Sequence, residues 1–184
     1  MFKKEIELEI IELSSEVTAL LKKLNAPERL VKHLTIVHSV TFEIISKFKD
    51  EWPDLVLKEK ETLFGASTHD VGKTKIRSEL YEKGSTHKLE GYKMLKDFGY
   101  PEELSRFAKT HGNWKNGNLD MEDLIVCVSD KIWKGQRIND LEELICKKLS
   151  DSLLLKYWDV YTKLDLIFGT IALEAEKRLI WQLQ

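Results

Sequence analysis

The chain of 184 residues is poor in cysteine and proline, with two and three copies respectively. Cys127 and Cys146 are far apart and lie in apolar segments with helical spacing, which predicts buried reduced thiols rather than a disulfide or a cysteine zinc site. No run approaches the roughly 20 apolar residues of a membrane span. The formal net charge of -2 gives no electrostatic basis for binding a nucleic acid polymer or an anionic membrane.

The N-terminal sequence Met-Phe-Lys-Lys continues with alternating acidic and apolar residues and lacks an apolar core of the kind found in signal peptides. We therefore expect a cytoplasmic protein. Hydrophobic residues make up 42% of the chain and charged residues 33%, which is ordinary for a globular domain long enough to bury a core.

The pattern that the chain does have is helical periodicity. Apolar residues recur at three- and four-residue steps nearly everywhere, and no sustained strand-like alternation or internal repeat is present. Helices are predicted over residues 6–24, 27–51, 55–71, 88–98, 101–111, 121–133, 141–149 and 152–181. Gly72 is expected to close the third helix as a C-cap. Residues 1–184 are thus predicted to form a single all-α domain.

The most informative local feature is the pair His69-Asp70 in Gly65-Ala-Ser-Thr-His-Asp-Val-Gly-Lys73. An adjacent histidine and carboxylate can hold one metal ion while the carboxylate keeps an oxygen for a second. Further candidate ligands occur along the chain: His33, His87, His111 and Asp130. Histidine and aspartate donors without cysteine favour Mn, Fe, Co, Ni or Zn over Ca, and facing helices of a bundle are a usual setting for such sites.

These residues resemble the HD-domain superfamily of metal-dependent phosphohydrolases. The superfamily pattern is a lone histidine, then His-Asp, often two further histidines, and a final aspartate. The matching segments follow in that order over residues 28–137: His33, Gly65-Ala-x-x-His69-Asp70-x-Gly-Lys73, His87-x-x-x-Gly91-Tyr, Thr110-His111 and Val128-Ser-Asp130-Lys131.

The resemblance implies an HD-domain-like helical bundle with a metal site between helices and one or two divalent transition metal ions per chain. The implied ligands of a catalytic metal are His33, His69, Asp70 and Asp130. His87 and His111 would hold a second metal bridged through Asp70, or lie near the substrate phosphate. His38 competes with His33 for the role of first ligand, and helix-face spacing favours His33.

Hydrolysis of a phosphoester needs an activated water and a neutralised phosphoryl oxygen. Asp70 or Asp130 is predicted to accept the proton of the water, and His111 to give a proton to the leaving oxygen. Four cations near these residues are expected to contact the phosphate, the last two less directly: Lys73, Lys131, Lys134 and Arg137.

The favoured interpretation is a metal-dependent phosphohydrolase that acts on a small phosphoester, for example a nucleotide or nucleoside phosphate. Two alternatives remain open from the sequence: a di-iron oxygenase of the same fold, and a metal-binding signalling module without turnover. The long C-terminal helix is expected to pack on the ligand-bearing helices or to extend into a homodimer contact.

Overall fold

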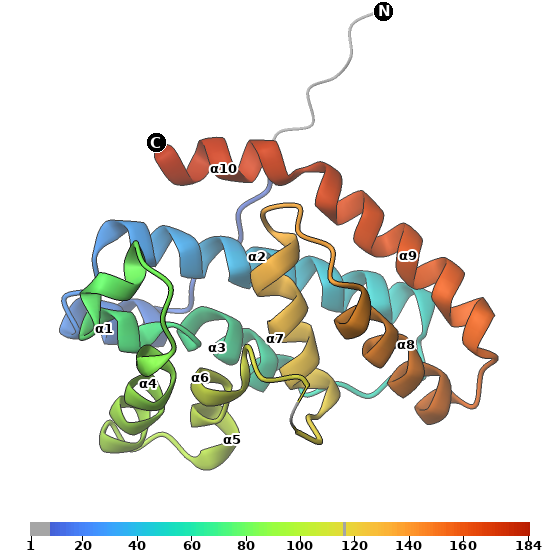
Figure 1. Cartoon of the computed structure of the whole chain (residues 1–184), viewed down its shortest axis with the longest axis horizontal. Coiled ribbons are helices and arrows are strands. Elements are labelled where there is room, and N and C mark those ends of the chain that lie inside the picture. Colours follow the sequence, from blue (N-terminus) through green and yellow to red (C-terminus); the bar gives the residue numbers. More distant parts are fainter. Residues whose placement is uncertain (1–7, 116) are drawn as a thin grey trace, which may run out of the picture.

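In the computed structural model, which describes residues 8–115 and 117–184, every regular element is a helix (Figure 1). In chain order the elements are α1 (Ser15–Lys23), α2 (Glu28–Glu51), α3 (Glu59–Thr68), η1 (Val71–Thr74), η2 (Arg77–Leu80), α4 (Thr86–Asp97), α5 (Glu102–Ser105), α6 (Phe107–Thr110), α7 (Met121–Ile132), α8 (Asn139–Leu153), α9 (Tyr157–Leu173) and α10 (Ala175–Leu183). The prediction of an all-α fold is confirmed. None of these described helices combines the length and the apolar character that a bilayer crossing needs.

The long helix α2 runs through the middle of the molecule and connects two apolar cores (Figure 1). Its first half, with Leu30 and Leu34, packs with α1, α4 and the end of α3. Its second half, with Ile44 and Phe48, packs with α7, α8 and α9. His33 lies on α2 close to the boundary between the two cores, so a polar site there is enclosed by apolar packing on both sides.

The N-terminal helix is shorter than predicted. It begins at Ser15, and the Ser14 hydroxyl caps it by accepting a hydrogen bond from the Val17 amide at 3.2 Å. Residues 8–14 are not helical, and the Ile11 amide donates to the Ser39 hydroxyl of α2 at 2.9 Å. Residues 5–10 alternate acidic and apolar side chains, a spacing that suits extended chain better than helix. The part of this prediction that concerns residues 6 and 7 lies outside the described residues.

The predicted C-terminal helix over residues 152–181 is in fact three pieces. Helix α8 continues to Leu153 and ends at Leu154, whose φ of 54° is left-handed, and α9 begins only at Tyr157. A second break falls at Glu174, where the Arg178 guanidinium donates to the Ile171 carbonyl at 2.6 Å. This hydrogen bond satisfies a carbonyl at the end of α9, which is why the break is tolerated.

Two other boundaries differ from the prediction. The third helix begins at Glu59 rather than at residue 55 and ends at Thr68, so Gly72 is not its C-cap and lies instead within the 3₁₀ helix η1. The helix predicted over residues 101–111 is divided into α5 and α6 at Arg106. Helix periodicity identifies which segments are helical, whereas local hydrogen bonds determine where each helix ends.

Candidate metal centre

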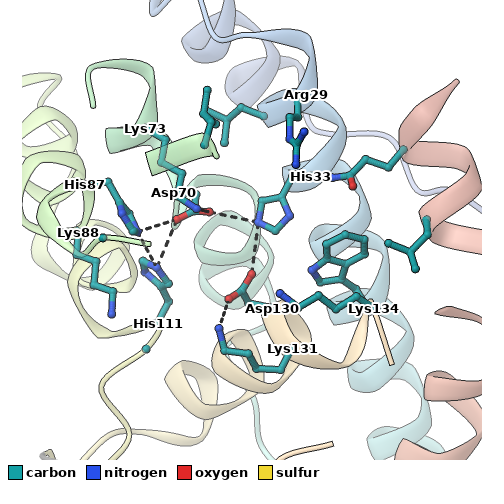
Figure 2. Close-up of a pocket in the computed structure, with 17 residues that line it drawn as sticks. Arg29, His33, Asp70, Lys73, His87, Lys88, His111, Asp130, Lys131 and Lys134 are labelled. Atoms are coloured by element: carbon teal, nitrogen blue, oxygen red, sulfur yellow. Dashed lines mark hydrogen bonds and ion pairs between the residues drawn. The ribbon is translucent and has the colours of Figure 1, made fainter. Parts of the chain in front are cut away.

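Six histidine and aspartate side chains from separate parts of the sequence converge between the helices. Figure 2 labels all of them except His69. They come from α2, the junction of α3 with η1, α4, the residue after α6, and α7: His33, His69, Asp70, His87, His111 and Asp130. All but His33 are buried. These are the six residues that the sequence proposed as metal ligands, and the fold brings all of them together.

The first ligand group consists of His33, His69 and Asp130. The two imidazole Nε2 atoms are 3.3 Å apart, and Asp130 Oδ1 lies 3.4 Å from the first and 3.6 Å from the second. At metal–ligand distances of about 2.0–2.1 Å, neighbouring ligand atoms are separated by about 2.9 Å in an octahedron and about 3.3 Å in a tetrahedron. The spacing therefore suits donors around one transition metal ion.

The second ligand group consists of Asp70, His87 and His111. Asp70 Oδ1 lies 3.0 Å from His87 Nε2 and 3.4 Å from His111 Nε2, and these two nitrogens are 3.4 Å apart. The other oxygen of Asp70, Oδ2, lies 3.3 Å from His33 Nε2. One carboxylate thus faces both groups, one oxygen to each, which is the arrangement of a bridging ligand.

In His69, His87 and His111 the Nδ1 atom makes a hydrogen bond, which determines whether the Nε2 atom can bind a metal ion. His69 Nδ1 donates to the Ala66 carbonyl at 2.8 Å and His111 Nδ1 to the Phe107 carbonyl at 3.2 Å. A carbonyl only accepts, so each Nδ1 carries the proton, and a neutral ring then presents the Nε2 lone pair to the cluster. His87 Nδ1 is likewise bonded to Glu79, so the Nε2 atoms of His87 and His111, 3.4 Å apart, face one another with lone pairs that repel unless a cation lies between them.

The surroundings of Asp70 and Asp130 favour the ionised form of both carboxylates, the form that binds a metal ion. Burial by itself raises the pKa of Asp70, but the surrounding imidazoles, His69 foremost, lower it well below its usual range. Burial likewise opposes ionisation of Asp130, and its hydrogen bonds to His33 and His69 lower its pKa well below the usual range. Asp70 Oδ1 is also buried without a hydrogen-bond donor. An orphaned carboxylate oxygen beside imidazole nitrogens fits a divalent transition metal.

Glycines explain how the second ligand group is assembled. A methyl group at Gly72 would lie 1.9 Å from the His87 carbonyl oxygen, and one at Gly91 would lie 3.0 Å from the Gly72 nitrogen. The backbone of η1 therefore packs directly on α4, at a distance that only glycine allows. This contact places Asp70, just before η1, beside His87 in the first turn of α4.

Glu79 orients His87 and was not identified by the sequence reasoning. Its carboxylate accepts hydrogen bonds from His87 Nδ1 and, at 3.1 Å, from the His87 amide. Although loss of hydration opposes ionisation, these bonds lower the pKa of Glu79 to about 2. Glu79 lies eight residues before His87 in a polar loop, and no local pattern distinguished it from Glu82 nearby.

A cavity of about 500 Å³ opens over the two ligand groups. Five cationic side chains line it: Arg29, Lys73, Lys88, Lys131 and Lys134. Lys73 Nζ lies 2.6 Å from Asp70 Oδ2 and Lys131 Nζ 2.7 Å from Asp130 Oδ2.

The other three cations, Arg29, Lys88 and Lys134, form no ion pair with a carboxylate of the described chain. Figure 2 shows them on different sides of the ligand cluster. Arg29 and Lys88 are additions to the predicted set, and each is one to four residues from a proposed ligand.

Two predicted residues lie elsewhere. Arg137 does not line the cavity: its guanidinium pairs with Glu142 at 2.6 Å and with Asp165 at 2.7 Å. The turn at Gly135, with φ of 78°, redirects the chain after α7 and carries Arg137 away. His38 is buried on α2, burial lowers its pKa, and it belongs to neither ligand group. The structure therefore places His33 at the cluster, as the helix-face spacing favoured.

Comparison with known proteins gives one result. Neither the curated proteins nor the solved structures include a match to this chain. A family model described as HD domain matches residues 30–153, two thirds of the chain and all six residues of the cluster. The chain therefore belongs to the HD domain family, whose members are generally metal-dependent hydrolases.

Proposed function

We propose that the protein is a metal-dependent phosphohydrolase acting on small phosphoesters, a nucleotide or nucleoside phosphate among them. The observation that carries this proposal is the charge of the cavity. Five cations surround two clustered aspartates, and three of those cations have no carboxylate partner in the part of the chain that is described. A cavity with surplus positive charge favours an anionic substrate, and phosphate is the anion that HD-type chemistry uses.

The roles of the five cavity cations follow from which of them already pair with Asp70 or Asp130. A divalent ion bound by the two ligand groups would supply an activated water and a Lewis acid for the phosphoryl oxygen. Lys73 donates to Asp70 Oδ2, the oxygen that also faces His33, and Lys131 donates to Asp130 Oδ2, which faces away from the histidines, so the two lysines orient these carboxylates. Arg29, Lys88 and Lys134 remain available to contact phosphate oxygens.

His111 is better suited to hold a second metal than to protonate the leaving oxygen. Burial lowers its pKa, Nδ1 is engaged by the Phe107 carbonyl, and Nε2 faces Asp70. A neutral ring with this tautomer has no N–H directed at the substrate. Lys88 lies close to His111: a methyl group at Gly112, the next residue, would be 2.5 Å from Lys88 Nζ. We assign to Lys88 the role of hydrogen-bond donor to the phosphate or the leaving oxygen.

The oxygenase alternative also needs His87 and His111 as ligands, so the ligand set alone does not separate the two chemistries. The cationic cavity does favour one, since oxidation of an organic substrate needs no surplus of lysine and arginine. A signalling module would keep the ion and the phosphate contacts without turnover. Phosphate release separates it from the hydrolase, and oxygen consumption separates the oxygenase from both.

The test compares the purified protein with Asp70→Asn and with Asp151→Asn, an exposed aspartate on α8 that serves as a matched control. Elemental analysis, phosphate release from a panel of phosphomonoesters and oxygen uptake are measured on all three proteins. The proposal expects metal and phosphate release in the wild type and in Asp151→Asn, and neither in Asp70→Asn. Bound metal with oxygen uptake and no phosphate release would overturn it in favour of oxidation.

We also propose that the protein forms a homodimer through the outer face of α9. Trp158, Leu166 and Leu173 are 71%, 72% and 86% exposed, and they lie on one side of the helix. An exposed apolar stripe of this kind is typical of an interaction surface. Light scattering of the wild type and of Leu166→Glu tests the proposal, which predicts a dimer and a monomer respectively. A monomeric wild type at all accessible concentrations would refute it.

A further inference from the structure

We propose that α10 is the specificity wall of the cavity and that Leu179 and Gln182 select substrates by the part of the ester that is not phosphate. The inference rests on the proposed function. Both side chains line the cavity, although α10 begins more than 120 residues after the end of α2 in the sequence. The family match ends at residue 153, so this wall is an addition of this chain to the matched HD domain.

A buried arginine holds α10 in place from one side. Arg178 is only 3% exposed, and its guanidinium reaches Glu43 of α2 at 3.1 Å and Glu174 at 3.4 Å. A buried guanidinium is retained only where carboxylates and carbonyls satisfy it, so α10 is fixed to α2 at this position. Leu179 follows Arg178 directly, and Gln182 is one turn further along the same helix.

The turn after α7 holds α10 from a second side. A methyl group at Gly135 would lie 3.1 Å from Ala175 Cβ and 3.6 Å from the Ala172 carbonyl oxygen. Helix α7 carries Asp130 and leads into Trp133, so this contact ties the start of α10 to the element that bears a ligand. The wall and the ligand cluster are therefore positioned relative to each other by two separate contacts.

The surface that α10 presents differs from the rest of the cavity. Leu179 is one of the apolar residues that line the cavity, with Leu30 and Trp133, and the Trp133 ring meets the His33 ring edge to face at 5.6 Å between centroids. An apolar wall that touches a ligand imidazole lies where the alcohol portion of a bound phosphoester extends. The cations of the cavity recognise phosphate, which all substrates share, whereas this wall contacts what distinguishes one ester from another.

Gln182 supplies the polar component of that wall. It is half-buried, lines the cavity, and makes no side-chain hydrogen bond within the described chain. A carboxamide offers one acceptor and two donors, so it pairs with an edge that presents both kinds of group. The wall as a whole suits an alcohol portion with an apolar face and a hydrogen-bonding edge, and not a short polyol.

The experiment measures kcat/KM for two phosphomonoesters, adenosine 5′-monophosphate and glycerol 3-phosphate, in the wild type, Leu179→Ala and Gln182→Ala. Leu183→Ala is the control, since Leu183 is on the same helix, 85% exposed and outside the cavity. We expect the wild type to prefer the larger ester and each wall variant to reduce that preference at least about tenfold. Bound metal and thermal unfolding should stay at wild-type values, and the kcat/KM for glycerol 3-phosphate should fall much less than that for adenosine 5′-monophosphate.

Arg178 is a positioning residue in this scheme. Arg178→Ala should reduce the same preference, and Arg178→Lys should restore part of it, while the metal content of both stays unchanged. An undiminished preference in both Leu179→Ala and Gln182→Ala overturns the inference and leaves the proposed function standing. A wild type that binds metal but hydrolyses neither these esters nor the wider panel refutes the proposed function, and the inference fails with it.

Discussion

The two ligand groups share one carboxylate, but they are built in different ways. The first group takes His33 from the 24-residue helix α2 and Asp130 from the 12-residue helix α7, both of which are deep in the apolar core. The second group takes His87 from the first turn of α4 and His111 from the residue after the four-residue helix α6. Two helices of the apolar core supply two of the three ligands of the first group. The second group depends on the residue before η1, on the residue after α6 and on the glycine contact that positions α4.

This difference teaches that Asp70 lies between a rigid ligand group and a more adaptable one. Regular helices fix side-chain positions through many backbone hydrogen bonds and buried contacts, whereas a 3₁₀ turn and a loop depend on a few specific contacts. We therefore expect the first ligand group to bind its ion more tightly. The following predictions test this expectation, beginning with the largest effect.

Removal of the Asp70 carboxylate should abolish metal binding by both ligand groups, so that no difference in their affinity remains. Asp70→Ala takes away Oδ2 from the first group and Oδ1 from the second, so bound metal should fall to background. Phosphate release should fall by more than the roughly 10–100-fold that substitution of a supporting residue causes. Elemental analysis and phosphate assay measure the two quantities. One full equivalent of metal in Asp70→Ala would contradict a bridging role.

Removal of one histidine from each group should show directly which ligand group binds its ion more tightly. His33→Ala should lose the tighter ion and nearly all phosphate release, whereas His111→Ala should retain about one equivalent of metal. The reason is that the donors remaining in the first group stay on packed helices. Calorimetric titration with manganese or zinc compares the two variants. Equal loss in both would show that the two groups bind as a single unit.

The contact between η1 and α4 should be intolerant of a single methyl group. In Gly72→Ala the new Cβ would lie 1.9 Å from the His87 carbonyl oxygen, so the backbones must separate and His87 moves with α4. Overpacking of this kind costs about 1–3 kcal/mol of unfolding free energy. Denaturant unfolding measures it, with Gly169→Ala as a control because the nearest atom to that Cβ is 3.7 Å away. Wild-type stability in Gly72→Ala would refute the close contact.

Loss of the Glu79 carboxylate should weaken the second group alone. Glu79→Gln removes the negative charge beside His87 Nδ1 and leaves only an amide oxygen to accept its hydrogen bond, so affinity for the second ion should fall about 10–100-fold while the first is unchanged. The pKa of Glu79 is depressed from 4.5 to about 2, so its contribution to stability is present above pH 4.5 and is lost as pH falls toward 2. Acid unfolding of the metal-stripped protein should therefore be less steep in Glu79→Gln. An unchanged acid transition would show that the carboxylate does not stabilise the fold.

A cation outside both groups should matter least to the reaction. Arg137→Ala breaks pairs with Glu142 and Asp165 that are remote from the cavity, so metal content and kcat/KM should stay at wild-type values. Lys134→Ala is the informative partner, since Lys134 lines the cavity, and it should raise KM several-fold. A larger kinetic effect in Arg137→Ala than in Lys134→Ala would reverse this assignment.

Much of this molecule follows from local patterns. The three- and four-residue periodicity predicted helices in the segments where the structure has them, because burial of an apolar face is a property of each segment. The order His33, His69-Asp70, His87, His111, Asp130 indicated the HD domain, which the family match confirms. Cys127 and Cys146 are both buried and unpaired, as their apolar surroundings predicted.

Helix ends and supporting residues did not follow from such patterns. The break at Glu174 depends on Arg178, which also bonds to Glu43 in a distant helix. Gly72 looked like a helix C-cap, but its role is to let α4 approach η1. Arg178 is also anchored by Glu43 in α2, and Gly72 faces His87 in α4, so both features depend on a contact with another helix that local periodicity does not encode.

The sequence by itself predicted an all-α fold from helix periodicity. Its resemblance to the HD domain identified the six side chains of the cluster, because both the apolar spacing and the order of the histidines and aspartates can be seen in the sequence. Only the tertiary structure decided that Asp70 faces both groups, that Glu79 supports His87, that Arg137 lies outside the cavity and that α10 covers it. The physical reason is distance along the chain. Apolar spacing acts within one helix, whereas a cavity wall or an orienting hydrogen bond exists only after separate helices have packed together.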